Sequence, residues 1–546
     1  MINLLLLTAR GWKSSCCYFS ICCFLVVTFP IGLSAQLKHD YVWAIGYNDN
    51  PAGSPPGFWL AESLLSFNSN PPDTIRLQTY YTRGSVNNMS MANSKGELIF
   101  YSNGCSLFDA DGNMLPGGEE ILHGETFDSF CRRSLPRYPT WDGSTIALPM
   151  DDKDSLFYVI YHRWEVNRNA EGFENPLGIV SFELYKIKVV LNQDGKYEAQ
   201  DRNLILRQNL GNGNFAAVRD TQAHHWWVII PPDVHLNNYE IIRLGPNGVD
   251  TILTQYFFYE GEHFEDDLVV SGGSVVFSQD GSIYARWIAG RGVGTMWWDF
   301  NREKGEMSNF RYLPHPDDEW IIHESSAGGI SFSPSGRFLY VNTMFNLYQY
   351  DLWEEDVESS IVHIAEFNGY LDSSTNFLNP VIFGFSRLAP NCKIYMVPQS
   401  TTRYLHVINY PDRKGLACDF RQQGLPTPGK NRFGIPYHPN YRLDSDYLWC
   451  DSTITTTTWF VPDEAEAGIY LYPNPAREYV VVGWSDIEPV EIALYDMSGR
   501  EVYSSRMQPG LPEYYLDLSG FSAGVYVVRV RDRSGGVGVE RLILSY

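Results

Sequence analysis

The feature that most constrains the fold of this chain is an internal repeat with a period near 56 residues. Three segments align with one another, residues 273–284, 329–340 and 384–395. Each reads as an apolar stretch, a turn containing Gly, Pro, Ser, Asp or Asn, and a second apolar stretch that ends in tyrosine. The closing tyrosines are 56 and 55 residues apart. Apolar runs separated by such turn residues predict two strands in every copy.

Looser copies extend the repeat toward the N-terminus, at residues 93–101, 151–158 and 223–230. After the second strand most units continue with further apolar stretches, for example residues 346–352 and 404–410. A long fixed period with several strands per unit is typical of a β-propeller. The physical reason is that one four-stranded blade cannot bury both of its faces alone, whereas blades around an axis bury each other.

A seventh blade can be assembled from the two ends of the repeat region. Residues 41–46 read as a strand, and residues 416–445 contain further apolar runs. A sheet built from both ends would leave no free strand edge. We therefore predict an all-β chain with a seven-bladed β-propeller over residues 36–450. The alternatives are six or eight blades, or a two-domain β-sandwich protein whose hairpins merely look alike.

Two pieces of one repeat unit carry a family resemblance. Residues 331–336 and 346–352 together resemble blades of the WD-repeat-like β-propeller superfamily. The resemblance implies the pattern of a blade and not a particular chemistry, because such folds host many unrelated functions.

The composition excludes some partners. Hydrophobic residues make up 44% of the chain and charged residues 19%, which is enough for a packed core and argues against disorder. The formal net charge is −23, so the surface repels nucleic acid and anionic lipid, and we expect neither as a partner. The body contains no Walker loop, dinucleotide fingerprint, HExxH or serine-nucleophile motif, and we expect no cofactor.

Residues 1–35 have the pattern of a secretory signal peptide. Arg10 and Lys13 precede an apolar run over residues 18–29, and Ser34 and Ala35 follow as small residues. We predict cleavage after Ala35. The alternative is an uncleaved membrane anchor, but the apolar run is shorter than the ~20 residues needed to span a bilayer.

The C-terminal part differs in pattern from the repeats. Residues 451–467 are rich in threonine and read as a linker. Residues 468–546 contain six or seven short alternating strands separated by turns, which predicts a small immunoglobulin-like β-sandwich.

The tail resembles the type A C-terminal sorting domain of proteins exported by the bacterial type IX secretion system. The matching motifs occur in the family's order and reach the end of the chain. Their residues are Leu471, Tyr472, Pro473, Asn474 and Pro475, then Tyr495, Asp496, Gly499 and Arg500, then Gly524 and Tyr526, and finally residues 541–544. The alternative is an ordinary immunoglobulin-like accessory module.

This resemblance implies a route and a set of partners. The signal peptide would take the chain across the inner membrane, and the tail would take it across the outer membrane of a Gram-negative bacterium. The partners implied are the type IX secretion machinery and its sorting peptidase. In the family the body is then released or attached to surface lipopolysaccharide.

One segment has the spacing of a calcium-binding loop. Asp109, Asp111 and Asn113 place oxygen atoms at alternate positions, with Glu120 further along. Met114 stands where such a loop needs glycine, so a hairpin turn is the simpler interpretation.

Two acidic runs, each with one histidine, are the candidate binding residues. They are Glu262, His263, Glu265, Asp266 and Asp267, and then His315, Asp317, Asp318 and Glu319. Both fall between predicted blades, where propellers place ligand-binding loops. Paired carboxylates are also what glycoside hydrolysis requires. Solvated surface loops are the simplest interpretation.

Residues 224–227, His-His-Trp-Trp, do not predict a metal site. Successive residues of a strand point to opposite faces, so the two histidines do not converge on one ligand. We predict that the tryptophans pack in the core.

Five cysteines follow the signal peptide, and an odd number leaves at least one of them unpaired. They are Cys105, Cys131, Cys392, Cys418 and Cys450, and the sequence leaves their pairing open.

These observations favour an exported propeller that binds a protein or a glycan without catalysis. The alternative function is a secreted hydrolase, a glycosidase or peptidase with its site in the propeller funnel.

Overall fold

The structure is a computed structural model, which describes most of the body and of the tail. The described residues are 37–46, 63–69, 71–76, 88–132, 143–166, 179–208, 214–232, 238–257, 273–288, 294–314, 328–372, 378–431 and 434–443, and in the tail 469–472, 474, 476–477, 479–484, 488–496, 500–507, 513–533 and 536–544. The predicted signal peptide and the predicted linker lie outside them, so the proposed domain boundaries stay predictions. Within these residues no helix is long and apolar enough to cross a membrane.

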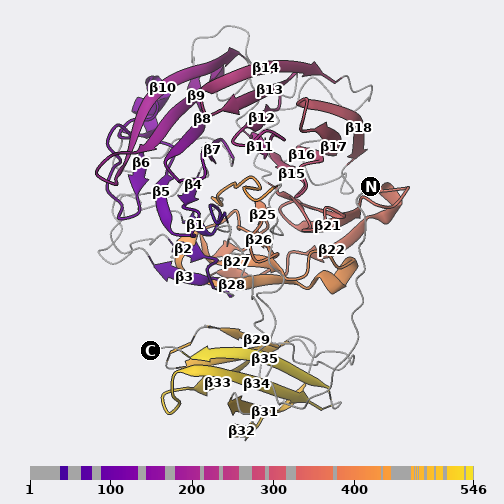
Figure 1. The fold of residues 1–546 in the computed structure, drawn as a ribbon. Coiled ribbons are helices and arrows are strands. Elements are labelled where there is room, and N and C mark those ends of the chain that lie inside the picture. Colours follow the sequence, from indigo (N-terminus) through magenta and orange to yellow (C-terminus); the bar gives the residue numbers. More distant parts are fainter. Residues whose placement is uncertain are drawn as a thin grey trace, which may run out of the picture. The chain divides into compact units, whose positions relative to one another are not determined.

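The described body consists of seven antiparallel sheets of three or four strands and one short ribbon (Figure 1). The first sheet contains β1 (Val42–Ile45), β2 (Ser63–Ser66) and β3 (Asp73–Arg76), and the second contains β4 (Met89–Ala92), β5 (Leu98–Ser102) and β6 (Leu107–Asp109).

The next three sheets have four strands each. They are β7 (Thr145–Pro149), β8 (Leu156–Val166), β9 (Ile179–Leu191) and β10 (Tyr197–Gln208); β11 (Ala216–Arg219), β12 (Trp226–Ile230), β13 (Asn238–Gly245) and β14 (Gly248–Tyr256); and β15 (Gly273–Phe277), β16 (Ile283–Ile288), β17 (Gly294–Asn301) and β18 (Glu306–Pro314).

Two more four-stranded sheets complete the series. They are β19 (Ile330–Phe332), β20 (Phe338–Asn342), β21 (Asn346–Asp351) and β22 (Val362–Glu366), and then β25 (Ser386–Leu388), β26 (Ile394–Met396), β27 (Thr402–Ile408) and β28 (Phe420–Asn431). A two-stranded ribbon of β23 (Leu371–Asp372) and β24 (Asn379–Pro380) lies between them in the sequence. The short helices are α1 (Glu125–Phe130), η1 (Glu358–Ser360) and η2 (Gly415–Cys418).

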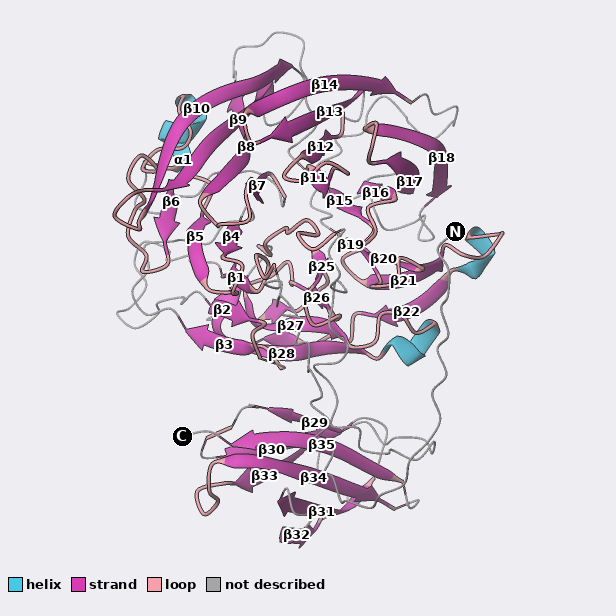
Figure 2. Cartoon of the chain, in the orientation of Figure 1, coloured by secondary structure: helices cyan, strands magenta, loops and turns pink. Residues whose placement is uncertain are grey.

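The sheets are arranged around a common centre, with the first strand of each sheet innermost (Figures 1 and 2). First strands of successive sheets contact one another, for example β1 with β4, β11 with β15, and β19 with β25. Each sheet follows the sequence order of its strands. The all-β prediction is confirmed, and the body has the arrangement of a β-propeller. The number of seven blades stays a prediction.

The repeat found in the sequence corresponds to the hairpin between the first two strands of a sheet. The three aligned segments contain β15–β16, β19–β20 and β25–β26. The repeat has polar residues at its turns because backbone N–H groups lose their strand partners where the chain reverses. The side chains of the turn residues accept hydrogen bonds from these N–H groups instead. Asn93 Oδ1 accepts from the N–H groups of Lys95 and Glu97, and Asp151 Oδ1 accepts from those of Lys153 and Ser155.

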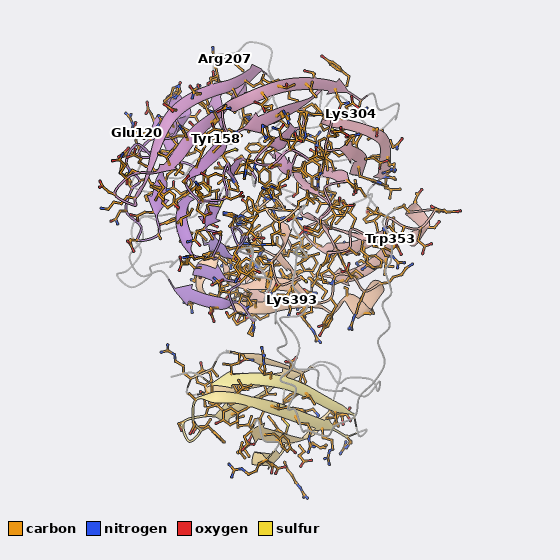
Figure 3. The ribbon with its side chains drawn as sticks, in the orientation of Figure 1. Glu120, Tyr158, Arg207, Lys304, Trp353 and Lys393 are labelled. Atoms are coloured by element: carbon orange, nitrogen blue, oxygen red, sulfur yellow. A yellow bond between two sulfur atoms is a disulfide. The ribbon has the colours of Figure 1, made fainter. Side chains whose placement is uncertain are left out.

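The hydrophobic core of the body lies between the facing surfaces of neighbouring sheets. The largest fully buried side chains include Trp43, Trp226, Trp287 and Trp298. Charged groups such as Glu120 and Arg207 lie toward the outer edge (Figure 3). Burial of large aromatic side chains between the sheets supplies most of the apolar contact.

The last sheet packs against the first. Trp43 and Leu65 of the first sheet share one buried cluster with Tyr395 and Leu405 of the last. The prediction that one blade mixes strands from both ends is wrong for the described residues, because β1 pairs with β2 and β28 pairs with β27. The two ends of the body meet through side chains instead.

Two cysteines of the body form a disulfide, Cys105–Cys131. Cys418 is free and buried. Cys392 is also disulfide-bonded.

The tail contains two sheets over one core. One is formed by β29 (Ile469–Tyr472), β30 (Tyr479–Trp484) and β33 (Glu513–Asp517), and the other by β32 (Glu501–Arg506), β31 (Pro489–Asp496), β34 (Gly524–Asp532) and β35 (Val537–Leu544) in that order. Alternate residues such as Val480 and Val482 face Leu494 and Val528 of the other sheet in one buried cluster. The immunoglobulin-like topology stays a prediction.

Candidate functional site

A segment that follows the last sheet, residues 434–443, connects several sheets at the centre of the body. The Tyr441 hydroxyl donates to the Ala147 carbonyl at 2.9 Å, and Arg219 Nη1 donates to the Tyr441 carbonyl at 3.2 Å. Asn440 Nδ2 donates to the Gln279 carbonyl at 2.6 Å. These partners come from three different sheets, so we call residues 434–443 the axial segment.

The axial segment also ties the end of the body to its beginning. The guanidinium of Arg442 forms two parallel hydrogen bonds with Asp40, at 2.7 Å and 2.8 Å, and both side chains are fully buried. Arg442 Nη1 donates in addition to the Leu37 carbonyl at 2.9 Å. A bidentate arginine–carboxylate pair has a fixed geometry, so it holds the two ends of the body in a fixed position relative to each other.

The sheet next to the axial segment has a glycine at one of its turns, and the missing side chain leaves room for the segment. Gly281 lies between β15 and β16 with a φ of +70°, a conformation that favours glycine. A Cβ atom there would lie 2.6 Å from Val218 Cγ2 and 2.9 Å from Leu443 Cδ2.

A pocket lies between the axial segment and the innermost strands. It is lined by Trp43, Ala217, Val218, Val276, Phe277, Ser278, Gln279, Ser331, Phe332, Arg387, Leu388 and residues 436–440. Its free space, counted out to solvent, is about 520 Å³. We call this the axial pocket. Among the residues that the structure describes, no carboxylate lines the axial pocket.

The charged group of the axial pocket is held by neighbouring strands. Arg387 Nη1 donates to Ser274 Oγ and to the Ser386 carbonyl, both at 3.0 Å. The guanidinium also lies over the Tyr437 ring, 5.2 Å from its centroid. Ser386 Oγ is 2.9 Å from Ser331 Oγ, which links the sixth and seventh sheets.

Three titratable side chains of the axial segment are held neutral by burial. Burial lowers the pKa of His438 to about 4 and raises the pKa of Tyr437 to about 12. Burial likewise raises the pKa of Tyr441 well above its ordinary value. The charged residue of the segment, Arg442, is paired with Asp40.

The sequence missed the axial segment as a functional element. The prediction of blade material in residues 416–445 holds for β28, whereas the axial segment is irregular. Proline does not distinguish the two, because β28 contains Pro426 and Pro428 just as the axial segment contains Pro436 and Pro439.

The candidate acidic runs lie outside the described residues. Glu262, His263, Glu265, Asp266, Asp267, His315, Asp317, Asp318 and Glu319 all fall in this category. Their roles stay predictions.

The calcium-like segment forms a tight turn after β6. Asp109 Oδ1 accepts hydrogen bonds from the backbone N–H groups of Asp111 at 3.0 Å and Asn113 at 2.8 Å. Glu120 pairs with Arg132 at 3.2 Å. In the part of the chain that the structure describes, no three His, Cys, Asp or Glu side chains are grouped to hold a metal ion.

The prediction for residues 224–227 is confirmed. Trp226 and Trp227 are buried, and their indole nitrogens donate to the carbonyls of Pro149 and Arg302. His224 and His225 lie near different carboxylates, of Asp152 and Asp250.

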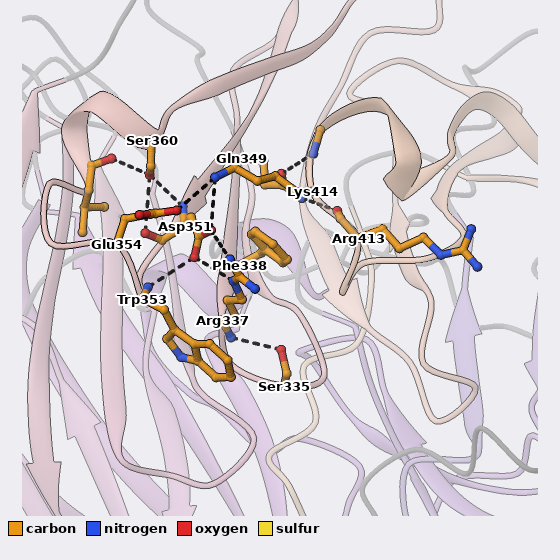
Figure 4. A network of polar contacts seen from close by, with 12 residues as sticks. Ser335, Arg337, Phe338, Gln349, Asp351, Trp353, Glu354, Ser360, Arg413 and Lys414 are labelled. Atoms are coloured by element: carbon orange, nitrogen blue, oxygen red, sulfur yellow. Dashed lines mark hydrogen bonds and ion pairs between the residues drawn. The ribbon is translucent and has the colours of Figure 1, made fainter.

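A second polar network lies on the sixth sheet (Figure 4). Arg337 donates to Asp351 through Nε at 2.9 Å and Nη2 at 2.7 Å, and Lys414 Nζ lies 3.4 Å from the same carboxylate. The hydrogen bonds from Arg337 hold the pKa of the buried Asp351 carboxyl below its ordinary value. Arg337 also lies between the Phe338 and Trp353 rings. The network fixes the loop before β28 on the sixth sheet.

The motif residues of the tail serve its fold. Asn474 Nδ2 donates to the Arg541 carbonyl at 2.6 Å, and Asn474 Oδ1 accepts from the Ile543 N–H at 2.8 Å. Asp496 accepts from the backbone N–H and the side chain of Arg500. These contacts close turns and hold the last strand.

The remaining motif residues are distributed over the same strands. Leu471 and Tyr472 lie in β29, Tyr495 in β31, and Gly524 begins β34. The Tyr526 hydroxyl donates to the Ser522 carbonyl at 2.7 Å. Pro473, Pro475 and Gly499 lie outside the described residues.

Comparison with known families identifies the tail. Residues 470–545 match the family described as the secretion system C-terminal sorting domain. The tail is thus a sorting domain of type IX secretion, which directs the chain to the cell surface or to secretion. The predicted family and localisation are confirmed. No curated protein matches the chain.

Solved structures resemble the chain only distantly. PorZ, an essential bacterial surface component of the type IX secretion system of Porphyromonas gingivalis, is 11% identical with a TM-score of 0.29, over 89% of this chain and 73% of PorZ. The periplasmic gluconolactonase PpgL of Pseudomonas aeruginosa is 10% identical with a TM-score of 0.34, over 87% and 99%. The β-propeller domain of Cps50 (Swd1) from Myceliophteria thermophila is 8% identical with a TM-score of 0.32, over 66% and 93%. We draw nothing about function from similarities this weak.

Proposed function

We propose that the exported body is a non-catalytic module that binds a protein or a glycan outside the cell. The observation that carries the proposal is the composition of the axial pocket, whose described lining residues include no carboxylate. A glycosidase needs two carboxyl groups about 5–10 Å apart across the scissile bond.

The proposal includes the fate of the tail. The match to the sorting domain supports recognition by the type IX machinery. Cleavage by a sorting peptidase, followed by release or by attachment to lipopolysaccharide, belongs to the same proposal because the tail resembles cargo that is processed in this way.

A combined binding and turnover assay tests the proposal. The mature chain, residues 36–546, is applied to glycan and protein arrays, and the bound compounds are then incubated with the protein and analysed by mass spectrometry. We expect specific binding and recovery of the ligand intact. Cleaved ligand would establish the hydrolase instead, and absence of binding on both arrays would reject the proposal.

A further inference from the structure

The outer strand of the fourth sheet, β14, has an open edge. It is the last strand in the order β11-β12-β13-β14, and no strand among the described residues pairs with its other side. It lies at the rim of the body (Figure 1). Ile252 is 40% exposed and Tyr256 is 61% exposed, and Thr251 and Thr254 are exposed as well. The backbone N–H and C=O groups along such an edge can pair with a further strand.

Most of β14 is regular and uncharged. From Thr251 to Tyr256, each residue of β14 faces the next residue of β13 without a register shift. The single register shift of this pair lies earlier in the strand, between Val249 and Thr251. None of the six residues from Thr251 to Tyr256 is charged, and none is proline or glycine. This stretch therefore has the features that allow another strand to add to a sheet.

The other outer strands of the body have features that hinder such pairing. β10 contains two register shifts, and its Ala199 N–H donates to the Pro116 carbonyl. β18 has a register shift and ends in Pro314, and β28 has two register shifts and contains Pro426 and Pro428. β3, β6 and β22 are only four, three and five residues long. Bulges, prolines and short length protect sheet edges from association, so β14 is the described edge that remains suited to it.

The sequence of β14 is complementary to itself in an antiparallel pair. Ile252, Thr254 and Tyr256 share one face of the strand, because side chains alternate. When two antiparallel copies meet at a two-fold axis through Thr254, Ile252 of each copy lies opposite Tyr256 of the other. An aromatic residue opposite a β-branched one stabilises a strand pair by ~0.2–1 kcal/mol, and this register forms the contact twice. An axis through Leu253 would instead place Ile252 opposite Thr254 and leave Tyr256 without an apolar neighbour.

We propose that two copies of the exported chain associate edge to edge through β14, antiparallel and centred on Thr254. The two fourth sheets then form one continuous sheet, and the contact closes as a symmetric dimer. The chain has a formal net charge of −23, so an uncharged stretch is where two copies can approach with the least repulsion.

The size of the contact sets the strength of the dimer. Six residues per copy are fewer than the ~20–30 on each side of a standard interface, so the dimer is weak and forms where the protein is concentrated. Its role goes beyond the proposed binding function. A dimer presents two binding modules together, and two weak sites held together bind more strongly than one.

Sedimentation equilibrium of the mature chain, residues 36–546, tests the dimer. The measurement extends to ~1 mM protein, because a weaker dimer would gain less than ~4 kcal/mol. We expect a reversible equilibrium between monomer and dimer. Ile252→Lys and Tyr256→Glu should each weaken the dimer roughly tenfold, because each change removes both apolar contacts and places a charge on the edge.

A mixture of the two variants tests the register. In the mixed dimer the introduced ammonium group faces the introduced carboxylate at one end, and the original contact between Ile252 and Tyr256 remains at the other. The mixture should therefore dimerise roughly three- to tenfold more strongly than either variant alone.

Leu204→Lys is the matched control. Leu204 is 42% exposed, close to the value for Ile252, but it lies on β10, whose edge has register shifts. This variant should dimerise as the unaltered chain does, and thermal unfolding confirms that all variants are folded.

Three results would overturn the proposal. A chain that stays monomeric up to ~1 mM would reject a second copy as the occupant of the β14 edge. A dimer that is unaffected by both Ile252→Lys and Tyr256→Glu would lie on another surface. A mixture no stronger than the separate variants would reject antiparallel pairing about Thr254.

Discussion

The tail and the axial pocket use their polar side chains in opposite ways. In the tail, the recognisable motif residues are paired within the fold, as Asn474 is with the backbone of β35 and Tyr526 with Ser522. In the pocket, Trp43, Gln279 and His438 each leave a buried polar atom unpaired within the described residues. The motifs that identify the tail thus support its structure, whereas the residues of the pocket form no motif in the sequence.

Removing the tail should have the largest effect. Deletion of residues 468–546 should abolish appearance outside the cell and leave the body in the periplasm, because the sorting domain directs passage across the outer membrane. Cell fractionation of a host with type IX machinery measures this. The Gln279→Met variant should be exported normally, and equal export of the truncated chain would contradict the role of the tail.

Breaking the buried ion pair of the body should cost the most stability. Arg442→Met leaves the fully buried Asp40 carboxylate without its partner, and such a loss costs about 3–5 kcal/mol. Thermal or denaturant unfolding of the mature chain measures it.

The matched control lies in the tail. Arg500 pairs with Asp496 at 3.2 Å but is 78% exposed, so Arg500→Met should cost less than ~1 kcal/mol. Equal losses in the two variants would contradict the claim that the axial segment joins the ends of the body.

Asn474→Ala should have an intermediate effect confined to the tail. The change removes both hydrogen bonds to β35, which corresponds to about 1–2 kcal/mol. Hydrogen exchange of the β35 amides should accelerate while exchange in the body stays unchanged. Asn203→Ala, which removes one exposed local hydrogen bond of the body, is the control and should leave both regions as they are. Unchanged exchange in β35 would show that Asn474 does not hold the last strand.

The smallest expected effect is a dependence of stability on pH. Burial alone would raise the pKa of Asp154, but hydrogen bonds from His39 and Ser94 outweigh it and lower that pKa. A carboxyl whose pKa is lower in the folded state stabilises the protein above its unfolded pKa of ~4. This contribution is lost as the pH falls through the folded value.

Asp154→Asn should therefore lower the free energy of unfolding by about 1 kcal/mol at neutral pH and by less in acid. Unfolding curves of both proteins between neutral and acidic pH measure the difference. A constant difference across that range would contradict the ionic character of the contact. The Asp109→Asn variant, altered in an exposed turn, serves as the comparison.

The sequence predicted those parts of the molecule that depend on local pattern. Turn residues such as Asn93 and Asp151 recur because each hairpin needs its own side-chain acceptor, and the period of the repeat follows from them. The tail was recognisable because its motifs are short stretches of sequence, such as the Asp496–Arg500 turn, although Asn474 makes its contacts with the distant last strand.

The axial pocket could not be predicted in the same way. Trp43, Gln279 and His438 come from distant parts of the chain and meet only because the sheets surround one axis. The ion pair between Asp40 and Arg442 likewise depends on how the two ends of the body meet. The spacing of residues along the sequence does not predict such long-range contacts.

The central claim is that the tail directs export and that the body recognises the ligand. A fusion protein tests this division of roles most directly. Residues 1–35 and 451–546 are joined to the two ends of an unrelated folded reporter, and its location and its binding to the glycan and protein arrays are measured. We predict that the reporter appears outside the cell and binds none of the ligands of the mature chain. A reporter retained in the periplasm, or one that gains those ligands, would contradict the account.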